Sequence, residues 1–479
     1  MTRGAGALAL AAALAGLVPA TPPAAALART VDHEVTTTPA GALTSTTVAI
    51  DEATTARRRA APIEVAVEPG TQMVGVSWAG GDDVEVQVAA PEGDGWGPWA
   101  DLHPDGPDGS DGGRVGGRTG VGPAWLGTAG VDRVAVQVVA GAPTALRVEA
   151  MRFAASPTAR AVTYDRPATP AGGPAIATRA SWAPGGWQGW RDGCTPAPTV
   201  MGALRFAVVH HTDGTNSYGA ADVPGILAGI YRFHTGTNGW CDIAYNLFVD
   251  RFGTVWEGRT GGLSAPIMGG HAKGFNTNSV GIAMIGSHVS TAPSAAAMTA
   301  LRDVLAWKLG SHGVDPQTST PIVSQGSPRY PAGQTVVLPT VQGHRDSGVT
   351  ACPGNLLYGR LPGLRNDVAA RIAATNVPAT WSPSTTGAVF FGRIDDAALG
   401  RRAANGRAGH YTSLVTRGGW PRDALATAIV LSAATDARIG GPDRLYRAAF
   451  GREAETSGLR YWVGRRDAGM SLTSMAHQF

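Results

Sequence analysis

Three short segments of the chain carry side chains that could bind a metal ion. His210-His211-Thr212-Asp213 directly follows an apolar run, and Gly343-His344-Arg345-Asp346 precedes Thr350-Ala351-Cys352-Pro353-Gly354 by a short loop. One histidine at a strand end is more often structural, but two imidazoles and a thiolate form a borderline-soft set that suits Zn²⁺. Three protein ligands leave a fourth tetrahedral position for water, which is typical of catalytic zinc sites. Cys352 also precedes a predicted helix N-terminus, which favours the thiolate that zinc needs.

The stretch from residue 178 to residue 375 contains the strands and helices that must hold these side chains. Apolar runs of strand length alternate there with runs whose apolar residues recur at helical spacing. Asp222 and Pro224 mark the start of one helix, because Pro suits the first helical turn. The predicted strands are 204–209, 243–249, 254–257 and 280–285, and the predicted helices are 222–233, 294–310 and 361–374, the last preceded by a short helical turn after Gly354. This order predicts a mixed α/β domain in which helices flank a central sheet.

The length of 479 residues suggests about three domains, and the flanking regions differ in character from the centre. Residues 62–154 show short alternating runs between Gly, Pro and Asp clusters, which predicts an antiparallel β-sandwich. Its tryptophans, Trp96, Trp99 and Trp125, either line a carbohydrate site or are simply buried, and burial is the favoured interpretation. Residues 387–479 are predicted to form polar helices with an imperfect internal repeat. The second copy stops at Phe479, so the natural protein is expected to extend further.

Four segments are predicted to lie outside these domains. Residues 1–28 combine Arg3, an apolar run and the small-x-small site Ala26-Leu27-Ala28, which is typical of a signal peptide. The apolar run is shorter than the ~20 residues that span a bilayer, so a membrane anchor is disfavoured. We expect no transmembrane segment later in the chain either, because no later run is long and apolar enough. Residues 29–61 are rich in Thr and Ala without periodicity and are interpreted as a disordered tether, and residues 155–177 and 376–386 are interpreted as linkers.

Charge excludes one class of partner. The 39 basic and 36 acidic residues leave a net charge of +3, which is too balanced for the basic surface that a nucleic-acid-binding protein usually presents. We therefore expect no nucleic-acid partner.

The central segment resembles the superfamily of peptidoglycan recognition proteins and type 2 N-acetylmuramoyl-L-alanine amidases. The ordered matches start with Arg179-Ala180-Ser181-Trp182, continue through Val208-Val209-His210-His211-Thr212, Tyr231-Arg232-Phe233-His234, Trp240-Cys241-Asp242-Ile243-Ala244-Tyr245-Asn246, Val255-Trp256-Glu257-Gly258-Arg259, Gly270-His271, Asn276 and Asn278-Ser279-Val280-Gly281-Ile282, and end with His344-Arg345-Asp346 and Thr350-Ala351-Cys352-Pro353-Gly354. The resemblance implies a mixed sheet flanked by helices, with a substrate groove over one face.

This resemblance also implies roles for individual residues. His210, His344 and Cys352 match the ligands of one zinc ion, and non-catalytic members of the family typically lack the cysteine. Tyr245 matches the tyrosine beside the zinc water, and Thr350 matches a second polar group that serves the transition state. The implied reaction is hydrolysis of the lactyl amide between muramic acid and L-alanine of peptidoglycan.

The resemblance further assigns substrate contacts, with one departure from the wider superfamily. His234, His271 and Asn276 match groove positions that contact muramyl peptide, although both histidines could equally be structural. A cytosolic branch carries a proton-transferring Glu where this chain has Ala283. Proton transfer is therefore expected to depend on Tyr245 and the water itself.

Secretion places the chain in an oxidising compartment, where a disulfide persists. We expect a bridge between Cys194 and Cys241, the alternative being two unpaired buried thiols. The C-terminal repeat resembles a helical domain of unknown function in secreted and surface bacterial proteins. We therefore expect an extracellular, cell-wall-associated protein, with cell-surface association through the flanking domains. The competing interpretations are a peptidoglycan-binding module that does not cut and a surface attachment protein.

Overall fold

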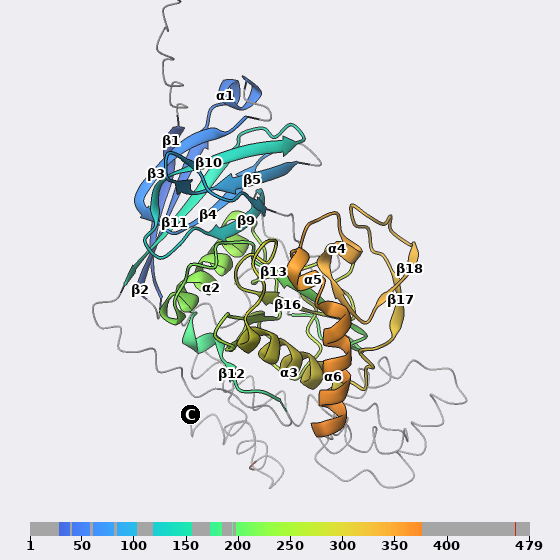
Figure 1. The fold of residues 1–479 in the computed structure, drawn as a ribbon. Helices are drawn as coiled ribbons and strands as arrows, with labels where there is room; N and C mark the ends of the chain where they lie inside the picture. Colours follow the sequence, from blue (N-terminus) through green and yellow to red (C-terminus); the bar gives the residue numbers. More distant parts are fainter. Residues whose placement is uncertain are drawn as a thin grey trace, which may run out of the picture.

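The computed structural model describes residues 28–38, 41–57, 61–80, 84–102, 118–155, 173–183, 194, 198–375 and 465. The predicted signal peptide apart from Ala28, the linker 376–386 and, apart from Arg465, the C-terminal helical repeat lie outside the described residues. Among the helices of the described part, none has the length and apolar character needed to cross a bilayer. The described residues form an N-terminal pair of β-sheets and a central α/β domain (Figure 1).

The N-terminal domain consists of two antiparallel sheets that enclose a core of valine, isoleucine and leucine. Inward-facing residues such as Val76 on one sheet and Val136 on the other are fully buried, as the alternating sequence pattern predicts. The first sheet has the order β1 (Ala28–Thr38), β2 (Gly41–Ile50), β11 (Arg147–Ala155), β4 (Met73–Trp78) and β9 (Thr119–Trp125), and the second has the order β3 (Ile63–Thr71), β10 (Val131–Ala140), β5 (Glu85–Ala89) and β8 (Ala100–Leu102). A short hairpin, β6 (Pro91–Glu92) and β7 (Gly95–Trp96), extends from the domain. The predicted antiparallel β-sandwich is thus confirmed.

The disordered tether predicted for residues 29–61 is wrong. This segment forms β1, β2 and the helix α1 (Glu52–Arg57), and β2 pairs along its whole length with β11. Threonine is β-branched and suits strands, so a Thr-rich segment without apolar periodicity can still be a strand where a neighbouring sheet covers it. Leu43 and Val48 are buried, and Thr47 donates a 2.6 Å hydrogen bond from Oγ1 to Glu149.

The central domain is built on a mixed sheet, as predicted, and this sheet has six strands. Its strand order is β12 (Ile176–Ala177), β15 (Val255–Glu257), β14 (Leu247–Val249), β16 (Ser279–Met284), β13 (Phe206–His211) and β19 (Val341–Gly343). All neighbouring pairs are parallel except β14 and β15, which form a hairpin from the predicted strands 243–249 and 254–257. The linker predicted at 155–177 is too long, because residues 176 and 177 belong to β12. A separate hairpin, β17 (Ser319–Val323) and β18 (Thr335–Pro339), lies beside this sheet (Figure 1).

Helices cover both faces of the central sheet (Figure 1). The helices α3 (Ala295–Ser311) and α6 (Leu361–Thr375) pack on one face, against residues such as Val209 and Leu247. The helix α2 (Val223–Arg232) and the π-helical turn Phe233–Thr237 pack on the other face, near Phe248 and Ala283. Helix α3 matches the predicted helix 294–310, and Ser294 caps it, since its Oγ accepts a 3.0 Å hydrogen bond from the N–H of Ala297. Two short helices, α4 (His344–Ser347) and α5 (Asn355–Tyr358), follow β19.

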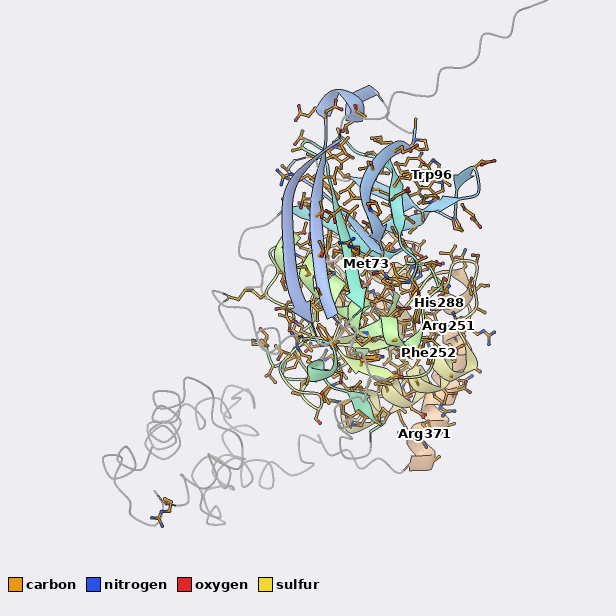
Figure 2. The ribbon with its side chains drawn as sticks, turned by 90° about the vertical axis from the view of Figure 1, so that its left-hand side faces the viewer. Met73, Trp96, Arg251, Phe252, His288 and Arg371 are labelled. Carbon is orange, nitrogen blue, oxygen red and sulfur yellow. A yellow bond between two sulfur atoms is a disulfide. The ribbon has the colours of Figure 1, made fainter. Side chains whose placement is uncertain are left out.

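The N-terminal domain packs tightly against the α2 face of the central domain. Met73 (Figure 2) and Trp125 share one hydrophobic core with Ile230 and Phe233. A Cβ atom on Gly229 would lie 2.5 Å from Sδ of Met73, so a larger residue there would force the Met73 side chain to shift. The N–H of Thr215 donates 2.7 Å to the carbonyl of Trp125, which further ties the two domains together.

The disulfide between Cys194 and Cys241 is present, with a Cα–Cα distance of 5.7 Å. It joins the segment before β13 to the loop after the π-helical turn, so this prediction is confirmed.

Candidate metal centre and active site

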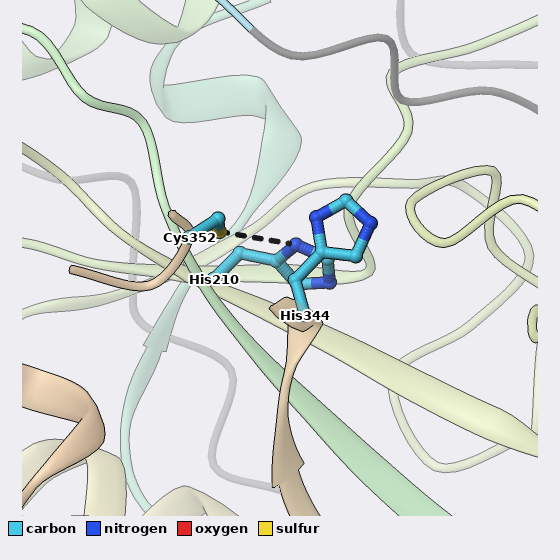
Figure 3. Close-up of side chains that lie close together, drawn as sticks. All are labelled: His210, His344 and Cys352. Atoms are coloured by element: carbon cyan, nitrogen blue, oxygen red, sulfur yellow. Dashed lines mark hydrogen bonds between the residues drawn. The ribbon is translucent and has the colours of Figure 1, made fainter. Parts of the chain in front are cut away.

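Three neighbouring elements bring His210, His344 and Cys352 together. His210 lies near the carboxyl end of β13 and His344 begins α4 directly after β19. The two strands are adjacent and parallel, with Val209 opposite Gly343, so their carboxyl ends place the two histidines side by side. The ring centroids are 4.7 Å apart, and Cys352 Sγ lies 3.8 Å from His210 Nδ1. The possible ligand atoms of all three side chains lie within 4.8 Å of one another (Figure 3).

The cluster has the dimensions and chemistry of a zinc ligand set. Zinc–nitrogen and zinc–sulfur bonds of about 2.1 and 2.3 Å in tetrahedral geometry separate the two donor atoms by about 3.6 Å, close to the 3.8 Å observed here. Burial, followed by the neighbouring His344, His271 and His211, lowers the pKa of His210 well below its usual 6.5. A neutral imidazole is the form that binds metal, so these residues fit zinc.

His271 and Asn276 lie behind His210 and do not line the cavity described below. His271 Nδ1 is 3.0 Å from His210 Nε2, and its own Nε2 is 3.3 Å from Ser279 Oγ. The side-chain oxygen of Asn276 accepts hydrogen bonds from the N–H groups of His271 and Ala272, at 2.8 and 2.9 Å. Both side chains are fully buried, and their contact with substrate stays a prediction. Their positions are those of residues that orient a metal ligand.

The loop that carries Cys352 is held by hydrogen bonds. The backbone N–H of Cys352 donates 3.0 Å to Thr350 Oγ1, and its carbonyl accepts 2.9 Å from the N–H of Arg345. The N–H of His211 lies 3.4 Å from the sulfur, which favours a thiolate there. Thr350 is not among the residues that line the cavity beside the cluster, so its catalytic assignment stays a prediction.

A small cavity of about 40 Å³, termed the chamber, adjoins the candidate ligands. His344 and Cys352 form part of its wall together with Tyr245 and His234. The N-terminal domain supplies a second part of the wall, formed by Asp101, Leu102, Gly122 and Pro123. The central domain supplies the rest of the wall, formed by His211, Thr212, Asp213 and Ile230. The chamber is therefore covered by the end of β8 and the middle of β9.

Tyr245 lies in the loop before β14, not within the predicted strand 243–249. Its ring packs edge-on against His210 at 5.1 Å and against Phe248 at 5.3 Å, and only 6% of the residue is exposed. The loop is anchored by a buried ion pair in which Arg179 Nη1 lies 2.8 Å from an oxygen of Asp242. Sequence and structure thus agree that Tyr245 stands beside the candidate ligands.

His234 follows α2 in the π-helical turn and lines the chamber as a neutral side chain. Burial, with a smaller effect of Arg259, lowers its pKa to about 3. Its Nδ1 accepts a 3.1 Å hydrogen bond from the N–H of Ala244, so the single ring proton must reside on Nε2. His234 can therefore donate a hydrogen bond from Nε2, which is compatible with its predicted contact to substrate.

The sequence interpretation missed the residues of the chamber that come from the N-terminal domain, and it missed Asp213. Burial raises the pKa of Asp213 to about 7, although its carboxylate accepts hydrogen bonds from Ser287 Oγ at 2.6 Å and from the N–H of Asp101 at 2.9 Å. Asp213 closes the His-His-Thr-Asp motif, so its position was a usable signal. Nothing local to Asp101 or Leu102 indicates that they face a metal centre.

Two protein families match this chain. The N-acetylmuramoyl-L-alanine amidase family matches residues 201–355, which confirms the predicted resemblance for the central domain. The family described as Rv3811 N-terminal galactose-binding domain-like matches residues 23–171, and it includes the segment wrongly predicted as a tether.

Among individual relatives, peptidoglycan-recognition protein SC2 of Drosophila melanogaster is 29% identical over 167 residues, covering 35% of this chain and 77% of the relative. N-acetylmuramoyl-L-alanine amidase of Sus scrofa is 30% identical over 192 residues, covering 40% of this chain but 27% of the relative. The solved structure of Drosophila peptidoglycan recognition protein SD is 24% identical and covers 40% of this chain and 92% of its own, with a TM-score of 0.30.

Proposed function

From a central domain that matches the N-acetylmuramoyl-L-alanine amidase family, we propose that this protein is a secreted, zinc-dependent amidase. It cleaves the lactyl-amide bond between muramic acid and L-alanine of bacterial peptidoglycan. The observation that carries this proposal is the buried cluster of His210, His344 and Cys352 beside a chamber that also contains Tyr245. A set of two imidazoles and one thiol leaves one tetrahedral position open, as catalytic zinc sites do.

In this proposal, the residues at the chamber and the metal centre have different roles in amide hydrolysis. His210, His344 and Cys352 hold one zinc ion, which when bound lowers the pKa of water to about 7 and polarises the amide carbonyl. The hydroxyl of Tyr245 donates a hydrogen bond to the oxyanion that develops on the carbonyl oxygen. His234 donates from Nε2 to the substrate, and His271 holds the His210 ring in the orientation that binding requires. Thr350 keeps the Cys352 loop in place through its hydrogen bond to the Cys352 N–H.

The names of the relatives and the disulfide support the proposed substrate and location. Relatives include proteins named for peptidoglycan recognition and for amidase activity. The disulfide between Cys194 and Cys241 suits an oxidising compartment, in agreement with the signal peptide predicted at residues 1–28. We further propose that the flanking domains associate the enzyme with the cell wall.

A second candidate function is peptidoglycan binding without cleavage. The observation that favours it is that the relatives include proteins named for peptidoglycan recognition and not for hydrolysis. Both candidates use the same residues, so the products formed from sacculi must distinguish them.

Digestion of purified sacculi tests the reaction directly. We expect mass spectrometry to find glycan whose lactyl groups carry free carboxylates, and stem peptides with a new L-alanine amino terminus. Metal analysis should give about one zinc per chain, and Cys352→Ser should lose most of both zinc and activity because it removes the soft ligand. Intact sacculi after incubation with the zinc-loaded protein would disprove the amidase and leave the binding function.

A further inference from the structure

A second, larger cavity adjoins the chamber and lies between the two domains. This interdomain cleft has a volume of about 460 Å³, within the range of roughly 300–1,000 Å³ that is typical of small-molecule sites. Asp213 lines both the cleft and the chamber. The hydrogen bond from the N–H of Asp101 to the Asp213 carboxylate therefore marks the place where the two spaces meet.

The two walls of the cleft differ in chemistry. The N-terminal wall contains the half-buried ring of Trp99, the apolar Leu126 and the exposed carboxylate of Glu92. The central wall, formed by the loops after β13 and β16, offers neutral polar side chains, namely those of Thr215, Asn216, Ser287, Ser290 and Thr291. Among the described residues that line the cleft, none is Lys or Arg. The cleft thus combines an aromatic face with hydroxyl, amide and carboxylate groups.

We propose that the interdomain cleft binds the glycan strand of peptidoglycan next to the bond cleaved in the chamber. This inference rests on the proposed function, since it extends the same substrate into a second space. The chamber is too small for a sugar ring, so the glycan must occupy adjoining space, and the cleft shares Asp213 with the chamber. The N-terminal domain is then part of the substrate-binding surface as well as a cover.

The chemistry of the walls selects the glycan over the stem peptide. A stem peptide carries several carboxylates, which the exposed Glu92 would repel in a cleft that has no lining Lys or Arg among its described residues. A saccharide is neutral along most of its length and presents hydroxyl and acetamido groups for hydrogen bonding. The apolar face of a sugar ring can lie on the indole of Trp99, because tryptophan offers a large apolar surface with a polar edge.

Oligomers of N-acetylglucosamine test the cleft separately from the reaction. They share the glycan chemistry but have no lactyl amide, so the amidase cannot cleave them. We expect calorimetric titration of the full chain with the tetramer to show binding, and equal binding to Cys352→Ser. Trp99→Ala should weaken this binding about tenfold and raise the KM for sacculi by a similar factor, with little change in kcat. Hydrolysis of a muramyl dipeptide, which has a single sugar, should change much less.

Two further variants show whether the effect belongs to the cleft. Ser290→Trp places a bulky ring on the opposite wall at an exposed position, and it should weaken tetramer binding without altering the fold. Trp96→Ala is the matched control, because Trp96 (Figure 2) is also half-buried but its ring lies 6.0 Å from the Arg133 guanidinium and does not line the cleft. It should bind the tetramer like the wild type.

The outcomes separate this inference from the proposed reaction. Absence of tetramer binding to the wild type would overturn the glycan site, as would unchanged binding in both Trp99→Ala and Ser290→Trp. A loss of tetramer binding in Trp96→Ala as large as that in Trp99→Ala would also overturn the glycan site. Tetramer binding that depends on Trp99, in a protein that leaves sacculi intact, would uphold the glycan site while the amidase proposal fails.

Discussion

His210 Nε2 lies 3.0 Å from His271 Nδ1, so the candidate metal ligand is held from behind by a second buried imidazole. Strand β16 makes room for this contact, because a Cβ atom on Gly281 would lie 2.2 Å from the His271 ring. Partners of this kind orient metal ligands, and their loss typically lowers metal affinity 10- to 100-fold.

The first prediction concerns this contact. His271→Ala should weaken zinc binding by roughly 10- to 100-fold, measured by competition with a chromogenic chelator. His271→Asn should retain most of the affinity, because its side chain can reach the position of Nδ1. His312→Gln serves as a control, since His312 is also buried but lies at the end of α3, where its Nδ1 is 2.8 Å from the carbonyl oxygen of Lys308. Equal zinc affinity in His271→Ala and wild type would contradict the positioning function.

The second prediction concerns the hydroxyl of Tyr245. Tyr245→Phe keeps the ring that packs on His210 and Phe248, so we expect the fold and the zinc content to remain unchanged. Turnover should fall by roughly 10² to 10³, as when one oxyanion donor is removed, with little change in substrate affinity. Single-turnover kinetics on a muramyl peptide would measure this. Turnover near that of the wild type would show that Tyr245 only packs, and would leave Thr350 as the candidate polar group.

The third prediction separates the two ring nitrogens of His234. His234→Asn keeps an acceptor for the N–H of Ala244 but lacks the donor at Nε2, whereas His234→Gln keeps a donor near that position. We expect KM for a muramyl peptide to rise in the Asn variant, by about tenfold for one lost hydrogen bond, and to rise less in the Gln variant. Thermal melts should show that both variants fold. If both raise KM equally, His234 acts through packing on Trp240 instead.

The fourth prediction concerns stability and pH at Lys308. Its Nζ donates to the carbonyls of Leu263 and Ala265, and burial lowers its pKa from 10.5 to about 7. Between these pH values the unfolded chain binds this proton and the folded chain does not. The free energy of unfolding should therefore rise with pH across this window, by up to about 1.4 kcal/mol per pH unit.

Urea denaturation of wild type and Lys308→Met measures this contribution by difference. The wild-type value minus the variant value should be constant below about pH 7 and increase from there toward pH 10.5. Titrating groups that do not interact with Lys308 cancel in the difference, whereas Lys308 lowers the pKa of His312, so the comparison is made above the range in which His312 titrates. A difference that stays flat over the whole range would mean that Lys308 keeps its proton in the folded protein.

Short-range patterns predicted much of the central domain. Pro224 and Ser294 located helix starts, and the apolar runs located the strands to within a few residues. These signals act between residues close in sequence, so they can be recognised without the rest of the fold. The prediction of a tether at residues 29–61 was wrong because β2 is stabilised by a long-range contact. It pairs with β11, which lies about a hundred residues later in the chain.

The sequence by itself determined the donor set of His210, His344 and Cys352, because the kinds of ligand atom decide which metal can be held, and the family motifs singled out these three positions. Only the tertiary structure decided what surrounds that set. It placed His271 and Asn276 behind His210, and it brought Asp101 and Leu102 over the chamber. Such contacts arise from the docking of one domain on another, where residues distant in sequence meet without any local pattern that records the encounter.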